Sequence, residues 1–130
     1  MKKLLIISIL SCNLTAFAAQ TAQNQAITEK LDEATAERLV NAIFRIENSK
    51  KYPYGIKSIQ IKGNTQEERE LYSRRICLNT VVNNHQRWLK AGKPGSYLDY
   101  LGGKYCPISA DPKGHRNWLV NIRKVSGLDF

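Results

Sequence analysis

The stretch Glu37-Arg38-Leu39-Val40-Asn41-Ala42-Ile43-Phe44-Arg45-Ile46-Glu47 has the apolar pattern of an amphipathic helix and ends in an acid. At about 100° per residue, Val40 and Ile43 fall within the same arc as Glu47. Glu47 is therefore predicted to project from the core-facing side, near the C-terminal end of the helix. Burial and the negative end of the helix dipole both raise the pKa of a carboxyl in that position. A carboxylic acid that keeps its proton near neutral pH suits general acid catalysis, although a Glu at the rim of the core has the same pattern.

The N-terminus has the features of a secretory signal peptide. Met1-Lys2-Lys3 is positively charged and is followed by an apolar run that is too short to span a bilayer. Ala16-Phe17-Ala18 fits the small-x-small cleavage pattern, so we expect a signal peptide over residues 1–18 and an exported protein, periplasmic or secreted. The residues before Cys12 form a loose lipobox, which leaves a lipid anchor at Cys12 as an alternative. No other segment could span a membrane.

The remainder predicts a single, mainly α domain. Residues 19–28 are small and polar and are expected to form a flexible leader, which leaves residues 29–130 as one domain with one core. Helices are predicted over residues 29 or 35 to 47, about 65–90, 96–101 and 115–124. Thr65 and Glu68 form a capping box at the start of the longest helix, and Gly102-Gly103 is expected to end the short one. Residues 56–61 alternate imperfectly, which predicts at most a short β-hairpin or an extended loop.

Removal of the signal peptide leaves two cysteines, Cys77 and Cys106. An even number of cysteines in an exported chain predicts one disulfide, and two free thiols are the alternative. The bond would close a loop of about 30 residues and stabilise the fold by about 3 kcal/mol on the chain-entropy model. It would also tie the loop that carries Tyr105 to the long helix, and loops fixed to a rigid scaffold are where binding surfaces are often built.

The charge balance favours an anionic partner. The formal net charge is +9, and it falls to +7 when Lys2 and Lys3 are removed with the signal peptide. The positive residues are scattered and form no DNA-binding arm, so an anionic glycan polymer is a better candidate than nucleic acid, while a solubilising surface is the alternative. The chain has no zincin motif, no P-loop and too few His and Cys for a structural zinc site, so we expect no metal or cofactor. We also expect a monomer.

Two segments resemble a known family. Ala42-Ile43-Phe44-Arg45-Ile46-Glu47 followed by Tyr54-Gly55-Ile56 is similar to the catalytic helix and the following loop of the lysozyme-like superfamily, and more narrowly to small lytic transglycosylases and goose-type lysozymes. Further stretches resemble a group of small exported or phage-associated proteins of that superfamily, namely residues 75–80, 83–88, 105–107 and 117–121. The resemblance covers residues 37–125. The Gly-Leu-Met-Gln stretch of transglycosylases is not present in this chain.

The resemblance implies an enzyme that cuts the β-1,4 bond between N-acetylmuramic acid and N-acetylglucosamine in the glycan strands of peptidoglycan. Glu47 would be the general acid, and Tyr54, Ser58 and Tyr105 are expected to line the substrate cleft. Hydrolysis usually needs a second carboxylate, and no spacing argument brings Asp99 or Asp111 to Glu47.

A lytic transglycosylase needs no second acid, because the 6-hydroxyl of the sugar closes an anhydro ring. This reaction is therefore favoured over hydrolysis. A non-catalytic peptidoglycan-binding or envelope module on the same fold is the main alternative, and a small secreted interaction protein is the other.

Overall fold

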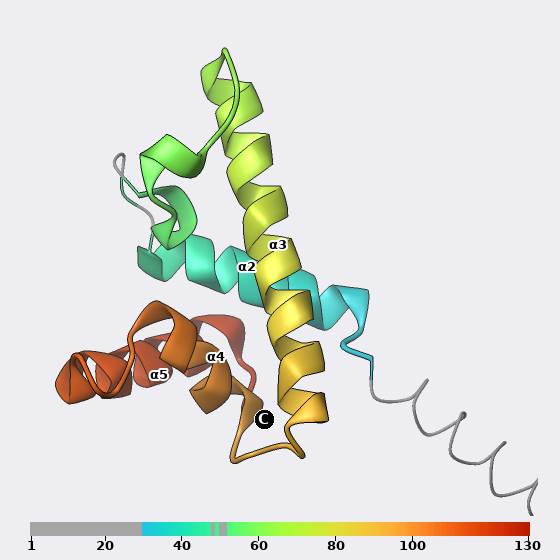
Figure 1. Cartoon of the computed structure of the whole chain (residues 1–130), viewed down its shortest axis with the longest axis vertical. Helices are drawn as coiled ribbons and strands as arrows, with labels where there is room; N and C mark the ends of the chain where they lie inside the picture. Colours follow the sequence, from blue (N-terminus) through green and yellow to red (C-terminus); the bar gives the residue numbers. More distant parts are fainter. Residues whose placement is uncertain (1–29, 48, 50–51) are drawn as a thin grey trace, which may run out of the picture. The chain divides into compact units, whose positions relative to one another are not determined.

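The computed structural model describes residues 30–47, 49 and 52–130 (Figure 1). In chain order the elements are α2 (Glu33–Glu47), the 3-10 turns η1 (Pro53–Gly55) and η2 (Ser58–Gln60), α3 (Gln66–Lys90), α4 (Tyr97–Tyr105) and α5 (Pro112–Ser126). The prediction of a mainly α protein is confirmed, and the described part of the chain contains no strand. The predicted signal peptide, the leader and Cys12 lie outside the described residues.

Helix α2 forms as the apolar pattern predicts. Its first turn is capped by the Asp32 side chain, which accepts a hydrogen bond from the Thr35 backbone N–H at 2.9 Å. Leu39, Val40 and Ile43 are buried on one side, and the helix ends at Glu47. The predicted end of this helix is therefore confirmed, and Glu47 lies on the core-facing side.

Helix α3 is the longest of the described elements and contacts α2, α4 and η1 (Figure 1). The predicted capping box is confirmed: Thr65 Oγ1 accepts from the Glu68 N–H at 3.1 Å, and Glu68 Oε2 accepts from the Thr65 N–H at 3.3 Å. These two bonds satisfy donors that the first turn of a helix otherwise leaves unpaired. The helix thus begins at a point that local sequence fixes.

Helix α4 continues beyond Gly102-Gly103 to Tyr105, so the prediction that the glycine pair ends it is wrong. A Cβ atom at residue 102 would lie 3.0 Å from His115 Cε1 and 3.1 Å from Trp118 Cε3. Gly102 is therefore required for the close approach of α5, which has a stronger effect here than the poor helix propensity of glycine. Helix α5 also begins earlier than predicted, because the Asp111 side chain caps it and accepts from the Gly114 N–H at 2.8 Å.

Residues 56–61 form neither a strand nor a hairpin. They form η2 and flanking irregular backbone. Ile61 is buried, whereas Ile59 is 92% exposed. Arg69 on α3 donates to the Ile61 carbonyl at 2.9 Å and so holds the segment against that helix. The extended-loop alternative describes this segment better than the hairpin does.

The four helices within the described residues share one apolar core. Helix α2 lies in contact with both α3 and α5, and α4 contacts α3 and α5 (Figure 1). The fully buried side chains come from all four helices, among them Leu39, Val40, Ile43, Val81, Leu98, Leu101 and Ile122. The Tyr97 hydroxyl donates to the Val81 carbonyl at 2.7 Å inside this core, which satisfies a polar group that burial would otherwise destabilise.

Candidate active site

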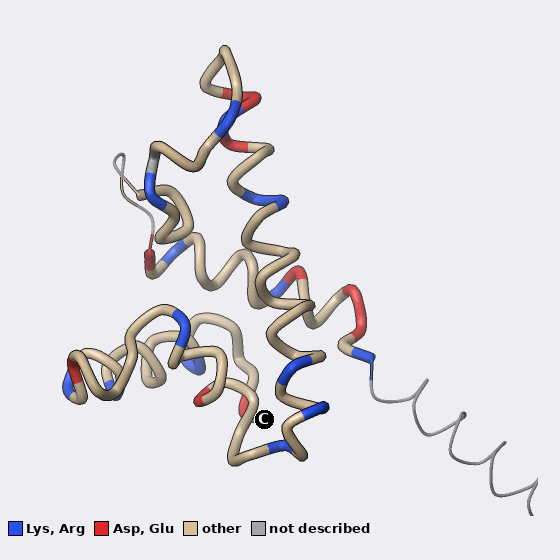
Figure 2. Tube along the Cα trace, viewed as in Figure 1, with Lys and Arg blue, Asp and Glu red and all other residues tan. Residues whose placement is uncertain are grey.

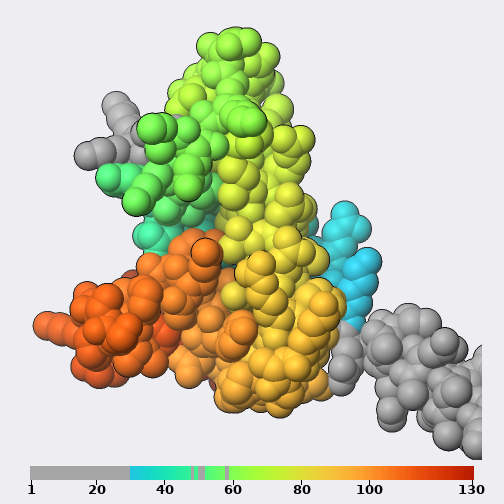
Figure 3. Space-filling model, in the orientation of Figure 1, coloured from blue at the N-terminus to red at the C-terminus, as the bar shows by residue number. Residues whose placement is uncertain are grey.

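A cleft of about 370 Å³ opens beside the C-terminal end of α2. Figure 3 shows the surface indented between the green residues of η1 and η2 and the orange end of α4. Residues of α2, η1, η2, α3 and α4 line the cleft, among them Glu47, Tyr54, Lys57, Cys77, Lys104 and Tyr105. Five separate segments of the chain therefore meet at this one cleft.

Glu47 is half-buried at the end of α2 and faces this cleft. Burial raises the pKa of its carboxyl, because the low-dielectric surroundings disfavour the ionised form. The Trp118 side chain lies close enough to lower that pKa in part, although its N–H does not reach hydrogen-bonding geometry. Glu47 thus lies half-buried at the predicted end of the helix, and burial favours its neutral form.

The turn of η1 brings main chain against the acid. Tyr54 and Gly55 both have positive φ, +56° and +71°, so two successive residues adopt the left-handed conformation. A Cβ atom at Gly55 would lie 3.4 Å from Glu47 Oε2 and 3.6 Å from Tyr105 Cδ1. A Cβ atom at Gly55 would thus meet only ordinary van der Waals contacts, and glycine is favoured there by its backbone conformation, while Tyr54 keeps a conformation that is uncommon outside glycine. Unusual backbone conformations of this kind are often found at functional sites.

Two aromatic pairs each contribute one ring to the lining of the cleft, Tyr54 and Tyr105. The buried Tyr54 ring packs on Phe44 with centroids 4.9 Å apart. On the other side the Tyr105 ring stacks on Trp118, at 5.4 Å between centroids and 12° between planes. Flat rings at the wall of a cleft are typical of sites that bind sugar rings.

The predicted disulfide is absent, since Cys77 and Cys106 are both free. The extension of α4 turns Tyr105, and not Cys106, toward α3, so that the Tyr105 hydroxyl lies 3.7 Å from Cys77 Sγ. Cys106 Sγ lies instead 3.8 Å from the Asp111 carbonyl. Burial raises the pKa of the Cys77 thiol to about 11, so this thiol stays neutral and is a poor nucleophile.

The structure brings three of the four predicted cleft residues together. Glu47, Tyr54 and Tyr105 line the same cleft, and the side chain of Ser58 lies outside the described residues. The cleft is also lined by residues that no sequence motif singles out, namely Lys57, Gln60, Ile76, Thr80 and Lys104. Ile76 and Thr80 are four residues apart on a predicted helix and so share a face, which is the one signal that could have grouped them.

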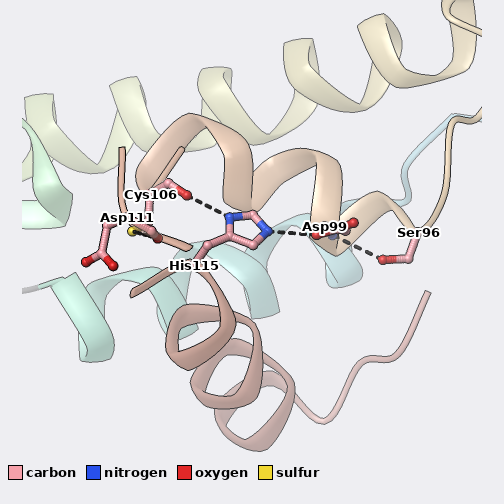
Figure 4. A network of polar contacts seen from close by, with 5 residues as sticks. All are labelled: Ser96, Asp99, Cys106, Asp111 and His115. Carbon is pink, nitrogen blue, oxygen red and sulfur yellow. Dashed lines mark hydrogen bonds and ion pairs between the residues drawn. The ribbon is translucent and has the colours of Figure 1, made fainter. Parts of the chain in front are cut away.

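Neither predicted candidate for a second carboxylate lines the cleft. Asp111 is the N-cap of α5, and Asp99 binds His115, whose side chain is 3% exposed (Figure 4). His115 donates from Nε2 to Asp99 at 2.7 Å and from Nδ1 to the Cys106 carbonyl at 2.6 Å. Both acceptors need a proton from the ring, so Asp99 raises the pKa of His115 and burial lowers it in part. Asp99 and His115 thus join α4 to α5.

Lys57 and Lys104 are the basic residues among the described residues that line the cleft. Lysine and arginine lie on every helix of the described part of the chain (Figure 2). Within that part, neither of the two cleft lysines forms an ion pair. Their charges are therefore available to an anionic group that enters the cleft.

Comparison with protein-family models, with curated proteins and with solved structures gave no match. Within the described residues, no helix combines the length and the apolar character needed to cross a membrane.

Proposed function

We propose that the protein is a lysozyme-like enzyme that cleaves the β-1,4 glycan backbone of peptidoglycan as a lytic transglycosylase. The main support is Glu47, which is the one carboxylate among the described residues that line the cleft and whose neutral form is stabilised by burial. A neutral carboxyl is the form that a general acid needs before it donates its proton.

In this reaction the Glu47 carboxyl donates its proton to the glycosidic oxygen as the bond from that oxygen to C1 of N-acetylmuramic acid breaks. The 6-hydroxyl of the same sugar then forms a new bond to C1, and its proton returns to the Glu47 carboxylate. The products are an anhydro-muramoyl end and a free N-acetylglucosamine hydroxyl. One carboxyl thus acts first as acid and then as base.

The absence of a second acid among the described lining residues favours this reaction over hydrolysis. Glycosidases that hydrolyse usually place two carboxyl groups about 5–10 Å apart across the scissile bond. Asp99 and Asp111, which were the candidates, have structural partners outside the cleft. A signal peptide would export the enzyme to the compartment that contains this substrate.

The test is mass spectrometry of the soluble products that the purified protein releases from peptidoglycan, beside the Glu47→Gln variant. Anhydro-muropeptides from the wild type are expected, with a rate at least about 100-fold lower for the variant, because general acid catalysis contributes about 10²–10⁴-fold. Reducing ends would instead indicate hydrolysis. If both proteins bind peptidoglycan equally and release nothing, the protein is a binding module.

A further inference from the structure

Trp118 has a buried polar group without a partner. Its side chain is 6% exposed, and its indole Nε1 has no hydrogen-bond acceptor among the described residues. An unpaired buried donor destabilises a fold, and native structures contain few of them. Trp88 has no such defect, because its indole N–H donates to the Gly95 carbonyl at 3.3 Å.

The Trp118 ring is held firmly in this orientation. One face stacks on Tyr105, with 12° between the planes. The benzo edge lies so close to Gly102 that a Cβ atom there would approach Cε3 to 3.1 Å. The indole N–H cannot turn away to find another acceptor without disturbing both contacts. The Tyr105 ring on which Trp118 stacks lies against Gly55, and so does Glu47, because a Cβ atom at Gly55 would be 3.6 Å from Tyr105 Cδ1 and 3.4 Å from Glu47 Oε2. The acid beside the indole is therefore Glu47.

The other polar groups around Glu47 include side chains from three elements and from the residue that follows η1. Tyr54 lies in η1, Lys57 follows it, Cys77 lies on α3, and Lys104 and Tyr105 lie on α4. The Tyr105 hydroxyl and the Cys77 thiol lie within contact of each other, at 3.7 Å. Trp118 is the neighbour whose proximity lowers the pKa of Glu47, against the larger and opposite effect of burial.

We propose that Trp118 is a positioning residue for Glu47. While Glu47 is neutral, the indole N–H beside it has no hydrogen-bond partner. When Glu47 releases its proton, the indole N–H donates a hydrogen bond to the resulting carboxylate. A donor aimed at charge that develops during a reaction stabilises the transition state more than the ground state. The catalytic part of this inference rests on the proposed function, whereas the hydrogen bond itself does not.

The hydrogen bond is tested by NMR on the full chain. The sequence contains two tryptophans, so the ¹⁵N spectrum has two indole N–H signals, and a Trp88→Phe variant assigns them. During a pH titration the Trp118 indole proton is expected to move downfield with the same midpoint as the Glu47 side-chain carboxyl carbon. In Glu47→Gln this movement should vanish. A Trp118 signal that ignores the Glu47 midpoint, or that still moves in the Gln variant, would overturn the proposal.

The positioning role is tested by Trp118→Phe beside Trp88→Phe, which removes an indole N–H far from the cleft. A third protein carries benzothienylalanine at residue 118, which keeps the shape of the side chain and lacks only the N–H. In both residue-118 variants the Glu47 midpoint is expected to rise, the alkaline limb of the pH–rate profile to move with it, and kcat to fall about tenfold with little change in KM.

An unchanged midpoint in the benzothienylalanine protein would contradict the hydrogen bond even if Trp118→Phe misfolds. An unchanged kcat with a raised midpoint would contradict the catalytic part alone. If the wild type cleaves no peptidoglycan, the proposed function fails and the catalytic part with it, while the two NMR midpoints still decide whether the hydrogen bond forms.

Discussion

Glu47 combines two properties that rarely occur together in a stable helix, namely a place on the core-facing side and an ionisable end. Its pKa is raised because burial disfavours the charge, so ionisation works against folding. The stability linked to this group is fully present below the pKa of the unfolded chain, near 4.5, and is lost as the pH rises through the higher folded pKa. Groups whose pKa is shifted by burial in a cleft are good candidates for function.

The Glu47→Gln variant is therefore expected to be more stable than the wild type at pH 7. At pH 4 the two should unfold at nearly the same temperature, because the wild-type carboxyl is then neutral in the folded protein and mostly neutral in the unfolded chain. Thermal unfolding at both pH values measures the difference. Glu70→Gln, an exposed change on α3, is the control and should show no such pH-dependent gain. Equal stability of wild type and Glu47→Gln at pH 7 would contradict the burial argument.

At the scale of the elements, the packing interface between α4 and α5 depends on one glycine, Gly102. Gly102 and Gly103 are neighbours in the same helix, yet a Cβ atom at 102 meets His115 and Trp118, whereas a Cβ atom at 103 meets nothing within 4 Å. A comparison of the two positions therefore distinguishes the effect of glycine on packing, which is present only at residue 102, from its low helix propensity, which is common to both.

The substitution Gly102→Ala is expected to lower the free energy of unfolding by about 1–2 kcal/mol, because overpacking outweighs the gain in helix propensity. Gly103→Ala should raise it by about 0.5–1 kcal/mol, since alanine favours helix and no neighbour obstructs it. Urea unfolding of the two variants beside the wild type measures both. A Gly102→Ala protein as stable as Gly103→Ala would mean that α4 and α5 are less tightly packed than the structure indicates.

The interface between α4 and α5 also shows which helix boundaries and which cleft residues the sequence could predict, and which it could not. The start of α3 and the end of α2 were predictable, because a capping box and an apolar repeat act locally. The continuation of α4 through Gly102 was not, because the reason lies in α5, at residues far along the chain. The cleft was predicted only where the family resemblance supplied Tyr54 and Tyr105. Lys104 and the indole of Trp118 depend on how α4 and α5 pack, which no local pattern encodes.

At the scale of the whole molecule, the formal net charge of +9 favours anionic partners without orienting them, and we expect charges inside the cleft to supply the orientation. Basic residues lie on every helix of the described fold (Figure 2), and Lys57 and Lys104 line the same cleft as Glu47. The stem peptides of peptidoglycan carry carboxylates that these two lysines could bind.

The double variant Lys57→Gln/Lys104→Gln is expected to weaken binding to peptidoglycan by about tenfold, since each exposed ion pair contributes up to about 1 kcal/mol. Lys90→Gln/Lys124→Gln removes the same charge at exposed positions outside the cleft and should weaken binding less than about threefold. Sedimentation of each protein with insoluble peptidoglycan, at low and at physiological salt, measures the affinities. The loss in the cleft variant should persist at physiological salt, where diffuse attraction is screened. Equal losses in both variants would mean that the overall charge, and not the cleft, recognises the polymer.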